Sequence, residues 1–458
     1  MAVKTKSREA GSFAVSAARR EAFRILLEVE SGQGHADDLL RGAKVSALAP
    51  ADRNLATTLV LGTLRWQIRL DAQIQPLLTR PKARLDAEIR IALRLGVFQL
   101  LYLDRIPAHA AIGESVALAK SAGHTFAAGM VNAVLRKLAS GPKEVAAQGR
   151  TSTEIAAETA HPLWMVERWA ATYGADGAGA IARHGQVQPV LALRVNGVGV
   201  ELDGVQLEAG VLLTDARVVV GGDVTATAGF REGRVRIQEE GSQLIAELVG
   251  RGERILDMCA APGGKTLILA ERNPGARIVA CENSGARIAA LRLRLEEMHQ
   301  PELTAGIELM QADATLATFS DAFDVVLADV PCSGTGTLGR NPEIRHRLAL
   351  GDLARHHERQ CALLRAALRN SKGRVVYSTC SLEPEENEAV VAEVLAGEPA
   401  WRQVSLRGQL GELRAEGRLT PGGSEYLLES VGTDGALRLL PGRFETDGFF
   451  VALMERVG

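Results

Sequence analysis

The chain has 458 residues, of which 46% are hydrophobic and 24% charged, ordinary values for a globular protein with two or three domains. No apolar run approaches the roughly 18 residues of a membrane-spanning helix, and the N-terminal segment lacks the hydrophobic stretch of a secretory signal. The five cysteines are odd in number and form no C-x-x-C pair. This pattern argues against a disulfide framework or a zinc site and predicts a cytoplasmic protein without a bound metal.

The net charge of −2 is unevenly distributed along the chain. Residues 1–150 carry 22 Lys and Arg against 13 Asp and Glu, a net charge of +9, so the remainder carries −11. A basic N-terminal third is typical of a protein that binds a polyanion such as nucleic acid. Solvated helix faces would explain the same charge.

Residues 15–140 place apolar residues at helical spacing almost throughout, as in AFRILLEVE and DAEIRIALRLGVFQLLYL, which predicts an all-α domain over residues 1–145. Residues 143–160 are small and polar and are interpreted as a linker. HPLWMVERWAATYG follows as a short amphipathic helix. The β-rich, Gly-containing segments up to RVRIQEEG then predict a small α+β module, so that the linker and the module together occupy residues 146–240.

From about residue 242 the chain alternates strands with helices. RILDMCA, ARIVACE, IELMQAD, FDVVLADV and GRVVYSTCS are predicted strands, and DGFFVALMER is the last one. This alternation predicts a Rossmann-like, doubly wound and mostly parallel sheet over residues 241–458.

The segment CAAPGGKT, residues 259–266, ends like a phosphate-binding loop. The full pattern requires Gly where Cys259 stands, which argues against an NTPase. Gly263 and Gly264 allow a ligand to approach the backbone closely, and Pro262 stiffens the turn. The loop follows the first strand of the sheet, where such folds bind ligands.

Two acidic residues follow the next strands. Glu282 ends the second strand, where an acidic side chain typically binds a ribose, and Asp313 follows the third, where an adenine edge would lie. Together with the loop they predict an adenosine-bearing cofactor, and both NAD and S-adenosylmethionine fit. The NAD fingerprint G-x-G-x-x-G is absent.

Two cysteines end the next two strands of the predicted sheet. Cys332 lies in ADVPCSGTGT and Cys380 in YSTCS, and because adjacent strand ends are neighbours, both thiols should face one pocket. A thiolate that adds to carbon 6 of a pyrimidine makes carbon 5 nucleophilic toward a methyl donor. Asp329 could hydrogen-bond the edge of the base. The spacing alone does not choose between the two thiols.

The other three cysteines have a simpler interpretation. Cys281 lies inside a strand and Cys361 on an amphipathic helix, and both are expected to be small buried hydrophobes. The side chain of Cys259 is interpreted in the same way. His356 and His357 lie on a helix without metal-ligand spacing.

Several motifs resemble the RsmB/Sun branch of the Nop/Sun RNA cytosine carbon-5 methyltransferases. They are CAAPGGKT, ADVPCSGTGT followed by NPEIRHR, YSTCSLEPEENE and DGFFVALMER, while the N-terminal region resembles a NusB-like RNA-binding bundle. The resemblance implies methylation of one cytosine in 16S rRNA or a small-subunit assembly intermediate by a monomer. It also implies that Cys380 is the nucleophile, that Cys332 assists product release and that S-adenosylmethionine is the donor. The implied cofactor contacts are Cys259, Ala260, Ala261, Pro262, Gly263, Gly264, Lys265, Glu282, Asp313 and Asp329.

A second hypothesis remains open from the sequence. The chain could be an RNA-binding ribosome-assembly or transcription factor in which the basic helical bundle carries the function and the methyltransferase domain is inactive. The intact loop, both acids and both thiols argue against that reading, and a measurement of cofactor binding would discriminate between the two.

Overall fold

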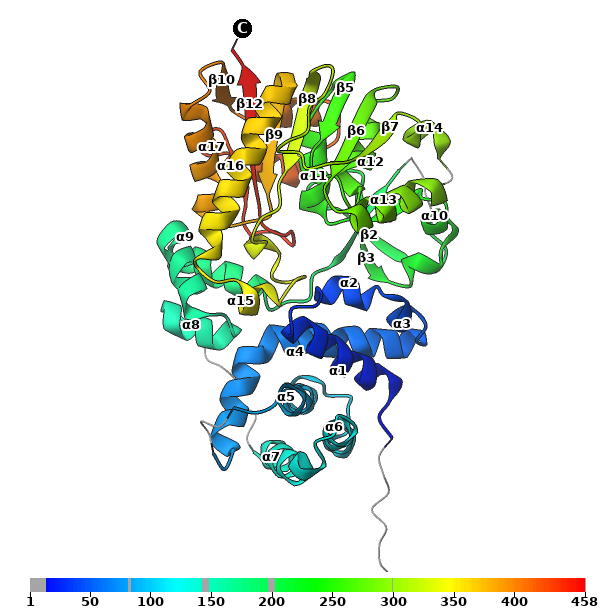
Figure 1. Ribbon diagram of the computed structural model, residues 1–458, viewed down its shortest axis with the longest axis vertical. Coiled ribbons are helices and arrows are strands. Elements are labelled where there is room, and N and C mark those ends of the chain that lie inside the picture. Colours follow the sequence, from blue (N-terminus) through cyan, green and yellow to red (C-terminus); the bar gives the residue numbers. More distant parts are fainter. Residues whose placement is uncertain (1–13, 81–83, 142–147, 197–201, 299, 458) are drawn as a thin grey trace, which may run out of the picture. The chain divides into compact units, whose positions relative to one another are not determined.

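The computed structural model describes residues 14–80, 84–141, 148–196, 202–298 and 300–457 (Figure 1). The chain divides into two compact units. The first contains Met1–Gln186 and Leu338–His346, and the second contains Val187–Thr337 and Arg347–Gly458. Within the described residues, no helix combines the length and the apolarity needed to cross a bilayer.

The first unit is helical. Its helices are α1 (Ala17–Glu30), α2 (Ala36–Leu40), α3 (Ala43–Ser46), α4 (Pro50–Ile74), η1 (Gln75–Leu77), α5 (Ala87–Tyr102), α6 (Ala108–Ser121), η2 (Thr125–Ala127), α7 (Ala128–Ser140), α8 (Ser152–Thr159) and α9 (Leu163–His184). In α1, the buried residues Ala18, Ala22, Ile25 and Val29 follow helical spacing, which gives the apolar stripe that the bundle core requires. The all-α prediction for this region is confirmed.

The prediction of a linker over residues 143–160 is wrong for the part that the structure describes, because α8 lies there. Thr151 and Glu154 form a capping box, in which each side chain bonds the backbone N–H of the other residue. This pattern satisfies N–H groups that would otherwise lack partners at the start of a helix. The amphipathic helix predicted next extends further than expected, to His184, with a kink at Gly174. Residues 142–147 lie outside the described part.

The short segment Leu338–His346 belongs to the helical unit although its neighbours in sequence do not. Arg345 is 2% exposed and donates hydrogen bonds to the carbonyls of Arg65 (3.1 Å) and Gly185 (3.0 Å). Burial lowers the pKa of Arg345 to about 9. Backbone carbonyls therefore compensate the buried guanidinium, and the segment is fixed by polar contacts as well as by packing.

The second unit begins with a small antiparallel sheet in the order β2-β3-β1-β4. Its elements are β1 (Leu191–Val195), β2 (Gln206–Ala209), β3 (Ala216–Gly221), η3 (Val224–Ala226), α10 (Ala228–Arg231) and β4 (Val235–Ile237). Leu193, Val195, Leu202, Val224 and Val235 form its small apolar core. Residues 197–201 lie outside the described part of the chain.

The larger sheet has the order β10-β12-β9-β8-β5-β6-β7, with β11 paired to β12. Its strands are β5 (Arg254–Asp257), β6 (Arg277–Glu282), β7 (Ile307–Gln311), β8 (Phe323–Asp329), β9 (Ser371–Thr379), β10 (Trp401–Val404), β11 (Leu437–Leu439) and β12 (Phe449–Arg456). The pairs among β5 to β9 are parallel, whereas β12 runs antiparallel to β9, β10 and β11. The multidomain fold class with a mostly parallel Rossmann-like sheet is confirmed.

Helices cover both faces of this sheet. The helices of the second unit from here on are α11 (Glu240–Leu248), α12 (Gly264–Arg272), α13 (Gly285–Glu297), α14 (Pro301–Thr304), η4 (Thr335–Thr337), α16 (Asp352–Asn370), η5 (Pro384–Glu386), α17 (Glu388–Ala396), α18 (Arg407–Ala415) and α19 (Pro421–Glu429). The short α15 (Ile344–Arg347) lies almost wholly in the segment that belongs to the helical unit. Successive residues of a strand pack into two different apolar cores. Val325 and Val376 pack with α11 and α12, while Val326 and Val375 pack with α16 and α17. This period of two is what a sheet buried on both faces requires.

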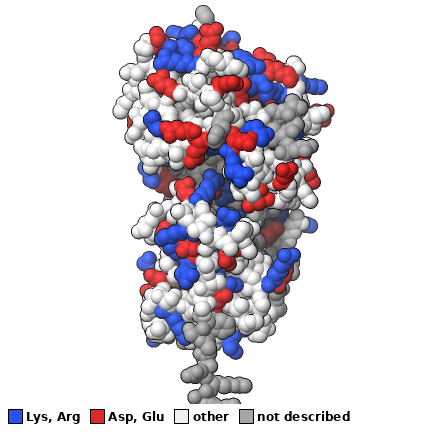
Figure 2. Space-filling view, turned by 90° about the vertical axis from the view of Figure 1, so that its right-hand side faces the viewer, with Lys and Arg blue, Asp and Glu red and all other residues white. Residues whose placement is uncertain are grey.

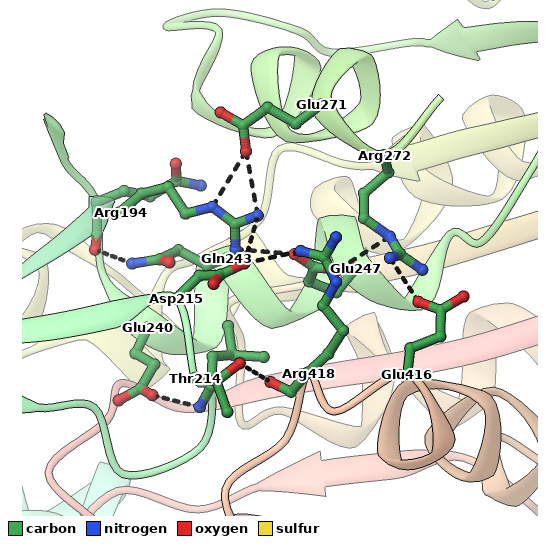
Figure 3. Close-up of polar contacts among 12 residues, drawn as sticks. Arg194, Thr214, Asp215, Glu240, Gln243, Glu247, Glu271, Arg272, Glu416 and Arg418 are labelled. Atoms are coloured by element: carbon green, nitrogen blue, oxygen red, sulfur yellow. Dashed lines mark hydrogen bonds and ion pairs between the residues drawn. The ribbon is translucent and has the colours of Figure 1, made fainter. Parts of the chain in front are cut away.

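A buried network of ion pairs joins the small sheet to α11 and α12 (Figure 3). Arg194 of β1, whose side chain is 2% exposed, lies 2.8 Å from Glu247 and 3.1 Å from Glu271. Glu271 also pairs with Arg236, and Glu247 lies 3.1 Å from Arg272. Each buried charge therefore has an opposite charge beside it, which buried ions require.

Candidate active site

The predicted site residues follow the carboxyl ends of β5 to β9, which share one edge of the sheet (Figure 1). In this parallel part of the sheet, β8 lies between β5 and β9, so the carboxyl ends of these three strands are neighbours. Asp329 is in register with Ser378, so the segments after β8 and β9 begin side by side. Ligands of doubly wound sheets bind at this edge.

The loop after β5 turns sharply at Gly263. Its φ of +94° lies in the left-handed region, and a Cβ there would come within 2.3 Å of Leu291. Gly263 donates its N–H to the Ala260 carbonyl at 2.7 Å. Only glycine satisfies both the backbone conformation and the available space, and α12 begins directly after it.

Two arginines of α13 fix the same loop from outside. Arg287 donates to the carbonyl of Ala261 at 2.6 Å, and Arg294 donates to that of Pro262 at 3.0 Å. The sequence did not identify these residues, because nothing in the spacing of α13 shows which of its arginines reach the loop. Their contacts hold the loop in shape.

The two acids predicted to contact the cofactor differ in environment. Glu282 is 5% exposed, accepts the Ser284 N–H at 2.9 Å and lies 3.3 Å from Arg287. Asp313 is exposed, and one of its oxygens accepts the N–H and the hydroxyl of Thr315. The two hydrogen bonds from Thr315 lower the pKa of Asp313. Glu282 is thus the more firmly positioned acceptor.

Lys265 follows the glycine turn, and its side chain is largely buried in the site. Its Nζ is 2.8 Å from Oδ2 of Asp329, and Oδ1 of Asp329 accepts the Ser378 hydroxyl at 2.7 Å. Burial opposes the charge of Lys265, but Asp329 and then Cys380 outweigh it and raise the pKa of the ammonium group. A fixed positive charge therefore lies near the thiol of Cys380.

The two thiols that the sequence singled out are brought together. The Sγ atoms of Cys332 and Cys380 lie 3.2 Å apart, and both side chains are half-buried. The hydrogen bond to Cys380 and then burial raise the pKa of Cys332 well above its usual range. Cys332 therefore stays a thiol beside its neighbour.

The remaining cysteines are located as the sequence predicted. Cys281 and Cys361 are 0% and 1% exposed. Cys259 packs against the core beneath the sheet edge, and burial raises the pKa of its thiol. None of the three belongs to the close pair of thiols, and all five cysteines are unbridged.

A buried carboxylate beneath the thiols was missed by the sequence analysis. Glu386 is 0% exposed and accepts the N–H of Ser333 at 2.8 Å and the side-chain amide of Gln360 at 2.9 Å. The hydroxyls of Ser333 and Ser381 both donate to its other oxygen. Since these serines directly follow Cys332 and Cys380, one carboxylate holds both cysteine loops. The repeated Cys-Ser pair was the only signal in the sequence.

Comparisons with known proteins identify the family of the chain. The family model described as 16S rRNA methyltransferase RsmB/F matches residues 248–455, and the NusB family model matches residues 16–140. The "Probable ribosomal RNA small subunit methyltransferase B" of Bacillus subtilis (strain 168) is 34% identical over 460 residues, covering 95% of this chain and 98% of the relative. The "Ribosomal RNA small subunit methyltransferase B" of Pseudomonas putida KT2440 is 35% identical over 440 residues, covering 91% of this chain and 96% of the relative.

A solved structure supports the fold over the same length. The crystal structure of PH0851 aligns with a TM-score of 0.76 at 24% identity, covering 97% of this chain and 100% of that chain. The likeness therefore extends to the helical region and the small sheet as well as to the large sheet.

Proposed function

This chain belongs to the 16S rRNA methyltransferase RsmB/F family, and we propose that it methylates carbon 5 of a cytosine in 16S rRNA with S-adenosylmethionine as donor. The observation that carries the carbon-5 proposal is the 3.2 Å separation of the Cys332 and Cys380 Sγ atoms. Methyl transfer to an exocyclic amine needs no thiol, whereas carbon 5 becomes nucleophilic only after a nucleophile adds to carbon 6.

The residues at the sheet edge fit the cofactor. The backbone of the glycine turn would lie against the cofactor, Glu282, which accepts the Ser284 N–H, would bind the ribose hydroxyls, and Asp313 would contact the adenine. Residues 259–265 and Asp329 complete the proposed set of contacts. When bound there, the cofactor supplies an electrophilic methyl group on a sulfonium.

In the proposed reaction the Cys380 thiolate would add to carbon 6 of the cytosine, forming an S–C bond while the π bond between carbons 5 and 6 breaks and its electron pair becomes available at carbon 5. Carbon 5 would then bond the methyl group as the sulfonium–methyl bond breaks and leaves its electron pair on the sulfur. Loss of the carbon 5 proton to water would re-form the double bond and break the S–C bond, which returns the thiolate. The ammonium group of Lys265, whose pKa Asp329 and then Cys380 raise against the effect of burial, would place a positive charge near the nucleophile. Cys332, kept protonated by its neighbour, would act after methyl transfer and assist release. Asp329, held by Ser378, would bond the edge of the base.

We propose that the helical unit binds the RNA around the target. Its NusB match and the net charge of +9 over residues 1–150 support this role. Figure 2 shows Lys and Arg side chains interspersed with Asp and Glu on the face that it draws. The cytosine itself must be unpaired or flipped out to reach the thiols.

The direct test is transfer of a radiolabelled methyl group from S-adenosylmethionine to unmodified 16S rRNA, followed by nuclease digestion and identification of the labelled nucleoside. We expect the label in 5-methylcytidine at a single site. Label in another nucleoside would contradict the carbon-5 proposal. No label together with no cofactor binding in calorimetry would favour the alternative of an RNA-binding factor with an inactive domain.

Glu386 is expected to be a positioning residue for both thiols. Replacing it by Gln removes one acceptor oxygen from a buried site that receives four hydrogen bonds. We expect the rate of methyl transfer at saturating substrate to fall by up to about 100-fold, because small misplacements of reacting groups have effects of that size. Cofactor affinity should be unchanged.

The matched control for that variant is Glu358→Gln, an exposed position on α16 in the same unit. Single-turnover rates and calorimetric cofactor affinities would be measured for both proteins. Equal rates for Glu386→Gln and Glu358→Gln would show that the carboxylate does not position the thiols.

A further inference from the structure

A second cluster of chemically reactive side chains lies on the helices that cover one face of the large sheet. His357 and Cys361 lie one turn apart on α16, and Glu393 lies on the adjacent α17 (Figure 1). Nε2 of His357 is 3.5 Å from the Cys361 Sγ and 2.8 Å from Oε2 of Glu393. One ligand atom from each residue lies within 4.8 Å of the other two.

The ring of His357 is held in the orientation that a metal ligand needs. Its Nδ1 lies 2.7 Å from the carbonyl oxygen of Glu385, which can only accept, so Nδ1 carries a proton. Nε2 is thereby directed at Cys361 and Glu393. Metal-binding imidazoles are commonly fixed by such a hydrogen bond from the opposite ring nitrogen.

The distance between His357 and Cys361 fits a tetrahedral ion. Bond lengths of about 2.05 Å to nitrogen and about 2.3 Å to sulfur place the two ligand atoms about 3.5 Å apart, which is the separation of His357 Nε2 and Cys361 Sγ. Nitrogen and oxygen ligands of the same ion would be about 3.4 Å apart. Because Oε2 of Glu393 lies 2.8 Å from Nε2 of His357, it must move slightly away from the imidazole. The Glu393 side chain is 51% exposed, so Oε2 can move outward while Oε1 keeps its hydrogen bond from Arg365.

We propose that His357, Cys361 and Glu393 form a binding site for a zinc-like divalent cation, with water as the fourth ligand. Arg365 donates to Oε1 of Glu393 at 2.8 Å, which orients the carboxylate and leaves Oε2 for the ion. Solvent reaches the site through the partly exposed imidazole and carboxylate, while Cys361 forms its buried floor.

Binding exchanges protons for the cation. The Cys361 thiol loses its proton, and Nε2 of His357 loses any proton that it shares with Glu393, so the ion replaces a hydrogen-bonded cluster by three coordinate bonds. The site would join α16 to α17. The sequence analysis found no metal-ligand spacing at His357, but His357 and Cys361 are four positions apart on one helix, a spacing that places two ligands on the same face. The third ligand could not be predicted, because it comes from another helix 32 positions after Cys361.

The test is a titration of metal-free protein with Co²⁺, read as the near-ultraviolet thiolate-to-cobalt absorption and the visible bands of tetrahedral cobalt. The protein carries Cys332→Ser and Cys380→Ser, since that pair of thiols could itself bind the ion. We expect both absorptions to saturate at one Co²⁺ per chain. Zn²⁺ added afterwards should remove them.

Three further substitutions in that background decide the assignment. Cys361→Ser should abolish the thiolate band, whereas Cys281→Ser, at another fully buried thiol, should retain it. His357→Ala, at a partly exposed position, should weaken Co²⁺ binding at least tenfold, and it keeps the test valid if Cys361→Ser fails to fold. A double variant that is folded by circular dichroism but gives no thiolate band, or a band that survives Cys361→Ser, would overturn the site.

Discussion

A protein carrying Cys380→Ala is expected to transfer no measurable methyl group to 16S rRNA. Without the thiolate there is no adduct at carbon 6, and carbon 5 of the cytosine stays a poor nucleophile. Removal of an enzyme's nucleophile typically lowers turnover by roughly 10³-fold or more. Because Cys380 lies outside the glycine loop, calorimetric affinity for S-adenosylmethionine should change little, which separates loss of chemistry from loss of binding.

Replacing the other thiol should have a different effect. A Cys332→Ala protein is expected to accumulate a covalent RNA adduct, visible as a slowly migrating band on a denaturing gel, since Cys332 acts after the methyl group is transferred. The raised pKa of Cys332, caused first by its hydrogen bond to Cys380, supports this division of roles. The double variant Cys332→Ala, Cys380→Ala is the control and should give no adduct. An adduct that persists without Cys380 would mean that the assignments must be exchanged.

The position of the two thiols could be predicted because the fold itself determines it. Alternating strands and helices place successive strand ends at one edge of a sheet, so Cys332 and Cys380 had to be neighbours if β8 and β9 were adjacent. The same argument placed Glu282 and Asp313 beside the glycine loop. These inferences need only the order of elements and one rule of sheet topology.

Contacts that depend on side-chain direction could not be predicted in this way. Glu386 reaches Ser333 across 53 positions of sequence, and no periodicity shows that its carboxylate is buried. The region between α17 and β12, which contains β10, α18, α19 and β11, was left unassigned from the sequence. The helix α8 was missed for a different reason, since its capping box was present in the sequence and was not used.

The buried ion pairs in Figure 3 predict the largest effect on stability. Arg194→Met should lower the free energy of unfolding of the second unit by about 3–5 kcal/mol, because Glu247 and Glu271 would keep their charges in a site that water does not reach. Urea denaturation followed by circular dichroism measures the change.

Arg277→Met is the matched control. Arg277 is also paired, with Glu308, but its side chain is 59% exposed. Its replacement should therefore lower the free energy of unfolding by less than about 1 kcal/mol.

The role of charge, as distinct from packing, can be isolated by a second substitution. Glu271→Gln in the Arg194→Met background removes a carboxylate that has lost one of its two arginines and keeps only Arg236, which in turn loses this partner. If uncompensated charge is the cause, the double variant should be less destabilised than the sum of the single variants by about 0.5–3 kcal/mol. Strict additivity would instead assign the loss to packing of the Arg194 side chain.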